Sequence, residues 1–173
     1  MTGYFEMPAS ERFFSTYVLS SCTLRSLQRD DLGAISNRLA GMDPWKRLGY
    51  SPAGLAGYLQ RPDPSLHRYA ILKPDLPIGV VCLRFPWLMG PFLEVLAIYP
   101  EFQRLGLGRE IMQWLESVES GFRNIWTTVS SFNIPALKFY RRYGFLETGT
   151  LIDLIKTGYD EILLRKIIIR SGA

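Results

Sequence analysis

A loop with two glycines is the part of this sequence best suited to chemistry. The segment Gln103–Gly108 (QRLGLG) lies between an apolar run that predicts a buried strand and a segment that predicts an amphipathic helix. The first turn of a helix leaves backbone N–H groups unpaired at the positive end of the helix dipole. Gly106 and Gly108 let a ligand come close to the backbone, while Arg104 and Arg109 add positive charge. The loop is therefore predicted to bind a diphosphate.

Two well-known phosphate loops do not fit these residues. A P-loop needs Lys and then Ser or Thr after its last glycine, whereas Arg109 and Glu110 follow Gly108. A dinucleotide-binding fingerprint needs a third glycine or an alanine at the position of Ile111. Two glycines alone are a weak signal, so a tight strand-to-helix turn without a ligand stays open as an alternative.

Two longer blocks narrow the prediction. Residues 93–108 (LEVLAIYPEFQRLGLG) resemble the acyl-CoA signature of the GNAT N-acetyltransferase superfamily. Residues 133–145 (NIPALKFYRRYGF) resemble its second block, in which an Asn is followed seven residues later by a Tyr and then by Gly-Phe. With the order of the expected strands, the resemblance covers residues 22–168.

The resemblance implies a cleft for acetyl-CoA, the co-substrate, between the fourth and fifth expected strands. In that family these two strands splay apart, and the pantetheine arm pairs with exposed backbone groups of the fourth. The pyrophosphate lies on the amides of the loop, and the Asn of the second block contacts the pantetheine. Carried over to this chain, the implied cofactor-binding residues are Leu96, Ala97, Ile98, Gln103, Arg104, Leu105, Gly106, Leu107, Gly108, Arg109 and Asn133.

The resemblance also implies the catalytic residues Tyr140 and Glu94. Tyr140 acts as the general acid that protonates the departing CoA thiolate. Its spacing with Ile134 and Leu137 is equally typical of a core stripe on a helix. Glu94 is the candidate base, directly or through water, although a one-residue change of register would turn it to the other face. Thr128 stands where protein-N-terminal acetyltransferases carry a base glutamate, which speaks against that particular mechanism.

Four residues are candidates for binding the acceptor. Trp45, Tyr50 and Trp87 lie in segments where the resemblance places acceptor specificity, and they could wall a pocket. Aromatic packing or a dimer contact would explain them equally well. Asp43 could hold an acceptor ammonium, or it could cap a helix end.

Other kinds of catalytic site find little support. His67 is the only histidine, and it follows no nucleophile motif. Cys22 and Cys82 are sixty residues apart and lie in apolar stretches, so we expect free, buried thiols and no metal site. Direct attack of an amine in a ternary complex is therefore expected rather than a covalent acyl-enzyme.

The expected elements alternate between strand and helix, which predicts an α/β fold. The run 78–85 (IGVVCLRF) is apolar throughout, as in a central strand covered on both faces. The resemblance adds a mixed, mostly antiparallel central sheet splayed at strands 4 and 5 and flanked by about four helices. The expected strands are 17–25, 69–72, 78–85, 92–98, 124–129, 145–151 and 161–168; the expected helices are 30–41, 52–61, 107–119 and 134–143.

Length and composition limit the setting. A chain of 173 residues with 47% hydrophobic and 21% charged residues predicts one folded domain, 1–173, with residues 1–15 as an N-terminal arm. A net charge of +4 is too small to indicate a nucleic-acid partner. No apolar run is long enough to cross a membrane, and a cytoplasmic protein is expected. Exposed aromatics and the apolar run 167–169 leave a homodimer open.

The sequence thus predicts an N-acetyltransferase that moves an acetyl group from acetyl-CoA to a small-molecule or peptide amine. Two alternatives stay open: an acyl-CoA-sensing module of the same fold without turnover, and a nucleotide-binding protein whose loop holds another diphosphate.

Overall fold

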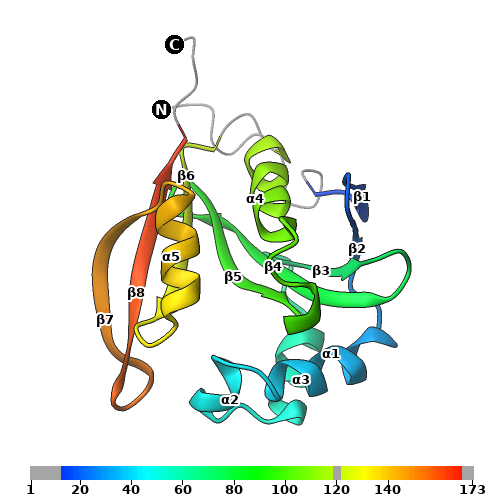
Figure 1. The fold of residues 1–173 in the computed structure, drawn as a ribbon, viewed down its shortest axis with the longest axis horizontal. Helices are drawn as coiled ribbons and strands as arrows, with labels where there is room; N and C mark the ends of the chain where they lie inside the picture. The colour runs from blue at the N-terminus through cyan, green and yellow to red at the C-terminus, as the bar shows by residue number, and fades with distance from the viewer. Residues whose placement is uncertain (1–12, 119–121, 169–173) are drawn as a thin grey trace.

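The apolar runs of the sequence lie side by side in one eight-stranded sheet (Figure 1). The structure is a computed structural model that describes residues 13–118 and 122–168. The strands follow the order β1-β2-β3-β4-β5-β6-β8-β7. Their bounds are β1 Thr16–Val18, β2 Thr23–Ser26, β3 Leu66–Leu72, β4 Pro77–Trp87, β5 Gly90–Ile98, β6 Asn124–Ser130, β7 Leu146–Lys156 and β8 Tyr159–Ile167. The helices are α1 Asp31–Ala40, α2 Trp45–Leu48, α3 Pro52–Gln60, α4 Leu107–Val118, α5 Ile134–Arg142 and the 3-10 turn η2 Pro100–Phe102.

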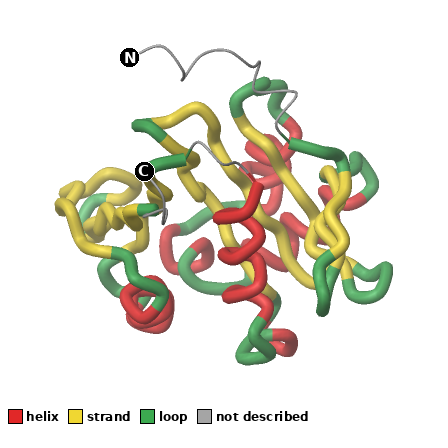
Figure 2. Tube along the Cα trace, turned by 90° about the horizontal axis from the view of Figure 1, so that it is seen from above, coloured by secondary structure: helices red, strands yellow, loops and turns green. Residues whose placement is uncertain are grey.

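Helices cover both faces of the sheet (Figure 2). On one face α4 buries Leu107, Ile111 and Leu115 against the strands, which is the spacing of one stripe on a helix. On the other face α1 and α3 pack through a second apolar cluster that includes Ile35 and Leu59. The core is therefore two layers of side chains, with the sheet between them.

The sheet opens between β5 and β6, the only parallel pair among the described strands. The two strands pair only through Phe92 with Trp126 and Leu93 with Thr127, and then separate (Figure 1). Residues 94–98 keep β4 as a neighbour on one side and have no strand on the other. The predicted mixed, mostly antiparallel sheet, splayed at this place, is confirmed.

Several element bounds differ from the prediction. The expected strand 17–25 is two short antiparallel strands, β1 and β2, joined by a turn. The short helix α2 was not predicted, because four residues show no helical period. Strand β7 runs on to Lys156, beyond the expected end at 151.

The expected N-terminal arm lies outside the described residues up to position 12, and so does Ile169. Of the remaining arm, Phe13 is buried against His67, with ring centroids 4.2 Å apart, whereas Phe14 is exposed. None of the helices in the two described ranges combines the length and the apolar character needed to cross a membrane.

Two glycine-to-alanine changes should shift stability in opposite directions. A Cβ at Gly90 would collide with the backbone carbonyl oxygen of Asn124, where β5 and β6 converge. Gly90→Ala should therefore lower the free energy of unfolding by about 1–3 kcal/mol. In contrast, a Cβ at Gly57 on α3 meets open space. Gly57→Ala should raise it by about 0.5–1 kcal/mol through helix propensity.

Urea unfolding of both variants beside the unchanged protein checks this pair. Equal effects of the two substitutions would show that the close approach at Gly90 does not constrain the sheet.

Candidate active site

The two-glycine loop forms a turn at the start of α4. Gly106 adopts φ +82°, a left-handed conformation that side chains disfavour, and Arg104 adopts φ 63°. The first backbone N–H of the helix that donates a hydrogen bond to a carbonyl is that of Glu110, whose acceptor is the Gly106 oxygen at 3.1 Å. Within the described part of the chain, the amides of residues 104–109 have no acceptor. Six N–H groups are therefore available to a ligand.

The open side of β5 supplies backbone groups next to this loop. Along Leu96, Ala97 and Ile98, successive residues turn their backbone groups alternately toward β4 and toward the splay. The carbonyl oxygen of Ile98 already accepts a hydrogen bond from the Gln103 side chain at 2.7 Å. The Ala97 carbonyl oxygen lies against Gly79 of β4, so Leu96 is the residue of this predicted set whose backbone groups have no strand partner among the described residues.

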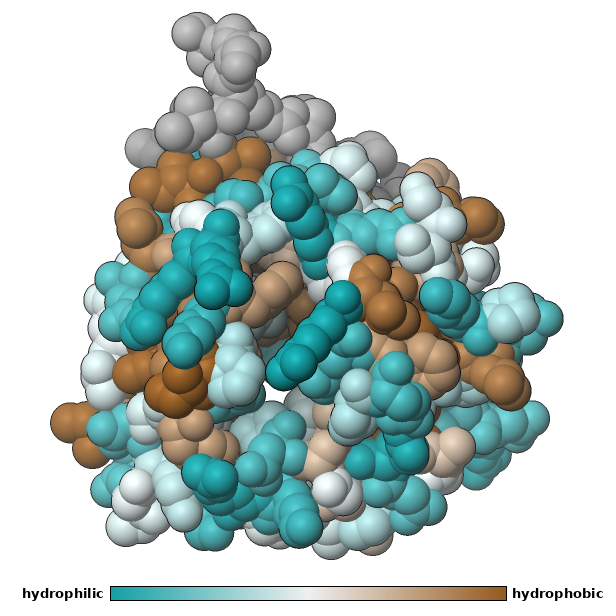
Figure 3. All heavy atoms as spheres, viewed as in Figure 1, coloured by the Kyte–Doolittle hydropathy of each residue, from teal (hydrophilic) through white to brown (hydrophobic). Residues whose placement is uncertain are grey.

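A cleft of about 1250 Å³ lies between β5, the loop and α5. In Figure 3 it is the hollow between the α5 side and the α1–α3 side of the molecule, with hydrophilic side chains along its rim. The predicted cofactor residues line it, except Leu105, whose side chain is exposed. The cationic side chains of the lining are Arg47, Arg104, Arg109, Lys138, Arg142 and Lys166.

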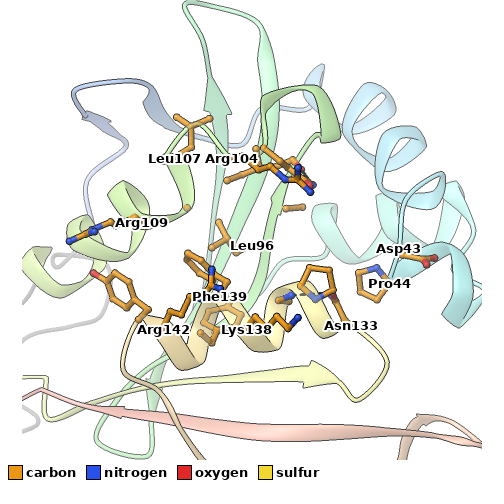
Figure 4. A pocket seen from close by; sticks show the side chains of 18 of the residues that line it. Asp43, Pro44, Leu96, Arg104, Leu107, Arg109, Asn133, Lys138, Phe139 and Arg142 are labelled. Atoms are coloured by element: carbon orange, nitrogen blue, oxygen red, sulfur yellow. Dashed lines mark hydrogen bonds between the residues drawn. The ribbon is translucent and has the colours of Figure 1, made fainter.

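Positive charge in the cleft is only partly compensated. Arg47 pairs with Asp43 at 3.3 Å, and Lys166 pairs with Glu116 at 2.5 Å. Arg104, Arg109, Lys138 and Arg142 form no ion pair with a described residue. Figure 4 shows Arg104 on the loop side and Lys138 and Arg142 on the α5 side. The cleft suits a ligand with several negative charges.

A second cavity of about 300 Å³ opens from the same place. It shares six lining residues with the cleft: Pro44, Trp45, Leu96, Asn133, Ala136 and Tyr140. Its lining contains two carboxylates, Glu94 and Glu161, and no Lys, Arg or His. The two adjoining spaces therefore differ in the sign of their charge.

Tyr140 stands at the junction of the two spaces. Its side chain is buried, and its ring packs against Phe139 and Phe145 at centroid distances of 5.0 and 5.1 Å. Burial raises the pKa of its phenol, and the neighbouring Thr127 side chain lowers it by less. The phenol is thus held in its protonated form, which can donate a proton. Tyr140 is therefore a core residue that also lines both spaces, and its role as general acid stays a prediction.

Glu94 points into the second cavity because of a β-bulge. Cys82 of β4 pairs with Val95 and Leu83 pairs with Leu93, so Glu94 is the extra residue of β5. One carboxylate oxygen is ion-paired with Arg84, and the other accepts a hydrogen bond from the Tyr58 hydroxyl at 2.7 Å. The expected direction of Glu94 toward the site is therefore present, with partners that the sequence did not indicate.

Glu161 is the second carboxylate of this cavity. Strand β8 sets it opposite Ser130 of β6, whose hydroxyl donates to one carboxylate oxygen at 2.5 Å. Only 2% of the residue is exposed, and burial raises the pKa of the carboxyl. Among the described residues, no Lys, Arg or His forms an ion pair with it.

The four acceptor candidates separate in the structure. Trp45 lines both spaces, Tyr50 lines the second cavity, and Asp43 lines the cleft while paired with Arg47. Trp87 lines neither space. It packs against Phe92 and Trp126, with centroids 4.8 and 5.4 Å away, at the closed end of the splay. The turn that carries Trp87 thus lies away from the site.

Sequence reasoning missed Arg84, Tyr58 and Glu161 as site residues. Arg84 joins Glu94 to Asp63, which it contacts at 2.8 Å, and these three lie on separate segments of the chain. Glu161 is the first residue of a predicted strand, a position where an exposed charged residue is common. The local sequence pattern therefore does not indicate that it is buried in a site. Asn133 was predicted to contact the pantetheine arm of CoA. It caps α5 by accepting a hydrogen bond from the Ala136 amide at 3.3 Å, and it lines both spaces.

In the described ranges, no three His, Cys, Asp or Glu side chains come together in a way that could hold a metal ion. Cys22 and Cys82 are free and buried.

The raised pKa of Glu161 predicts a stability that depends on pH. An acid with a raised folded pKa contributes fully below its unfolded value, about 4.3, and that contribution is lost as the pH rises through the folded value. Tyr50 is a neighbouring titratable group whose pKa is raised mainly by burial and secondly by the charge of Glu161. Relative to the unchanged protein, Glu161→Gln should therefore gain stability as the pH rises above about 4.

Urea unfolding at a series of pH values measures this difference, because the other titrating groups are common to both proteins. Glu147→Gln, on exposed β7, is the matched control and should show no such gain. A constant difference between the Glu161 curves would contradict the prediction.

Comparison with curated proteins gives no significant match. Among solved structures, an acetyltransferase from Thermus thermophilus is similar with a TM-score of 0.70 and 18% identity, covering 88% of this chain and 100% of that one. A spermidine N-acetyltransferase chimera from Vibrio cholerae and hSSAT is similar with a TM-score of 0.67 and 22% identity. The match covers 86% of this chain and 96% of that one. At such identities the likeness shows the fold.

An acetyltransferase from Bacillus anthracis in complex with acetyl coenzyme A is similar with a TM-score of 0.53 and 22% identity. It covers 65% of this chain and 66% of the other. The model of the acetyltransferase (GNAT) family matches residues 27–145, well over half of the sequence, and the chain therefore belongs to the GNAT family of acetyltransferases.

Proposed function

We propose that this enzyme transfers an acetyl group from acetyl-CoA to a primary amine by direct attack in a ternary complex. The observation that carries the proposal is the junction at Tyr140, where a cationic cleft meets a cavity that contains carboxylates. An anionic co-substrate and a basic amine would enter from opposite sides and meet there. Attraction of opposite charges favours each ligand in its own space.

The cleft has the groups that acetyl-CoA needs. The free amides of 104–109 would hold the pyrophosphate, and the unpaired cations along the rim would hold the remaining phosphate charge. The open edge of β5 at Leu96 would pair with an amide of the pantetheine arm. Unpaired backbone groups inside a sheet cost free energy unless a ligand or water satisfies them, which favours such pairing.

The transfer is one displacement. The amine nitrogen forms a bond to the thioester carbon while the carbon–sulfur bond breaks. Tyr140 donates its phenolic proton to the departing thiolate. An amine with a pKa of about 10.4 is protonated at first and loses two protons as it becomes the amide. Glu94, or a water that it holds, accepts one of them, and the other restores the Tyr140 phenol. Both Glu94 oxygens already accept hydrogen bonds, which supports the route through water.

The same engaged state of Glu94 favours one alternative, a module that binds acyl-CoA without turnover. The two functions differ in thiol release. A broad panel of primary amines, assayed with acetyl-CoA for free thiol, gives turnover for the enzyme and none for the binding module.

Tyr140→Phe should retain CoA affinity and lower turnover by roughly 10- to 10⁴-fold, the usual size of such a proton transfer. Only the hydroxyl is lost, and the ring contacts with Phe139 and Phe145 remain. Steady-state kinetics together with CoA binding by calorimetry measures the two effects separately.

Tyr159→Phe is the matched control, because Tyr159 packs on Phe132 and lines neither space. Its turnover should equal that of the unchanged enzyme. Unchanged turnover in Tyr140→Phe would remove Tyr140 from the chemistry.

CoA should stabilise the fold against heat, whereas NAD and ATP should not. A ligand that binds only the folded state adds about 2.7 kcal/mol at a concentration of 100 times its dissociation constant. Thermal unfolding with each ligand at equal concentration tests this. A larger shift with NAD or ATP than with CoA would favour the nucleotide-binding alternative.

A further inference from the structure

Glu161 is a buried carboxylate that is fixed in position and faces a cavity. One carboxylate oxygen is fixed by the Ser130 hydroxyl, and the other accepts no hydrogen bond from any described residue. The residue is 98% buried in the protein, yet its side chain lines the second cavity. A carboxylate in such a place is costly unless a partner with positive charge meets it.

The cavity contains no such partner from the chain itself. The Glu94 charge is compensated by Arg84, which is shared with Asp63. Lys156, on the same hairpin as Glu161, donates instead to the Arg47 carbonyl oxygen at 2.9 Å. The described residues thus leave an ionised Glu161 without a positive partner, and a cationic group of a ligand can take that place.

Glu161 lies away from the reacting centre. Tyr140 and Thr127 are neighbours, and Thr127 is level with Leu93 at the closed end of the splay. Glu161 pairs with Ser130, three residues further along β6, which is roughly 10 Å at the rise of an extended strand. An acceptor whose reacting nitrogen lies near Tyr140 would place a group several bonds away beside Glu161.

Aromatic and apolar side chains complete the walls of the cavity. Trp45, Tyr50 and Tyr58 line it from the segments of α2 and α3, and Ile155 lines it from β7. Contact between Lys156 and the Arg47 carbonyl holds the β7–β8 hairpin against the α2 segment. Aromatic faces next to a carboxylate suit an organic cation.

We propose that Glu161 binds a second cationic group of the acceptor, so that the substrate is a small linear amine with an ammonium or guanidinium at its far end. This inference rests on the proposed acetyl transfer and adds the class of acceptor. Glu161 is then a specificity residue, and it takes no part in the bond changes at Tyr140.

The experiment compares linear diamines with the amino alcohols of the same length, using the full chain and acetyl-CoA. The terminal hydroxyl of the amino alcohol has about the size of the second ammonium of the diamine, but it carries no charge. The unchanged enzyme should have the higher kcat/KM with the diamine. Glu161→Gln should raise the KM of the diamine by about 10- to 100-fold, since hydrogen bonds to a charged group are worth that much. The kcat of this variant with the diamine, and its kcat and KM with the amino alcohol, should change little.

Glu147→Gln, outside the cavity, is the matched control and should leave both substrates unaffected. Thermal stabilisation by CoA shows that each variant is folded with its cleft intact. Glu161→Ala is a second variant, which should lose the same preference even if the amide of Gln makes a substitute hydrogen bond.

Two results would overturn the inference and leave acetyl transfer standing. The first is an unchanged preference for diamine over amino alcohol in both Glu161 variants. The second is an equal fall of kcat for both substrates, which would assign Glu161 to proton transfer. Absence of thiol release with every amine in the unchanged protein would instead reject the proposed function itself.

Discussion

The separation of β5 from β6 after two residue pairs is the constraint on which the site depends. A sheet is stable when its backbone groups are paired, and here a stretch of a central strand gives up that pairing. Gly90 allows the strands to converge at one end, against the Asn124 backbone, and the core layers on both faces hold the two halves of the sheet in place. The opening is therefore fixed by packing, and it leaves both a cleft and a deeper cavity.

Charge divides this opening into two parts. The loop before α4 and helix α5 bring unpaired cations and free amides to the cleft, whereas β5 and β8 bring carboxylates to the cavity. Tyr140 lies where these parts meet and is kept protonated by its burial. A member of the GNAT family of acetyltransferases has use for both parts, since an anionic thioester and a basic amine must be brought together. The burial of Tyr140 in the core thus places its phenol where the two parts meet.

The prediction from sequence was most accurate where the signal is local. The stripe of Leu107, Ile111 and Leu115 indicated α4, and the left-handed Gly106 has the conformation for which a glycine is suited. Short or irregular segments were less well predicted. Strands β1 and β2 read as one strand because the turn between them has no glycine or proline, and α2 is too short to show a period. Trp87 resembled a pocket residue by type, yet its partners Phe92 and Trp126 are set by strand pairing.

By itself the sequence determined the order of the elements, the two-glycine turn before α4 and the family, because these are recorded in the spacing of neighbouring residues. Only the tertiary structure decided the direction of Glu94, which depends on a bulge relative to β4, and its partnership with Arg84 and Tyr58. It also decided the place of Glu161, since β8 pairs with β6 across thirty-one residues of chain. Contacts over such distances depend on register and on the path of the whole chain. No local pattern encodes them, and they are what assembles the acceptor side of the site.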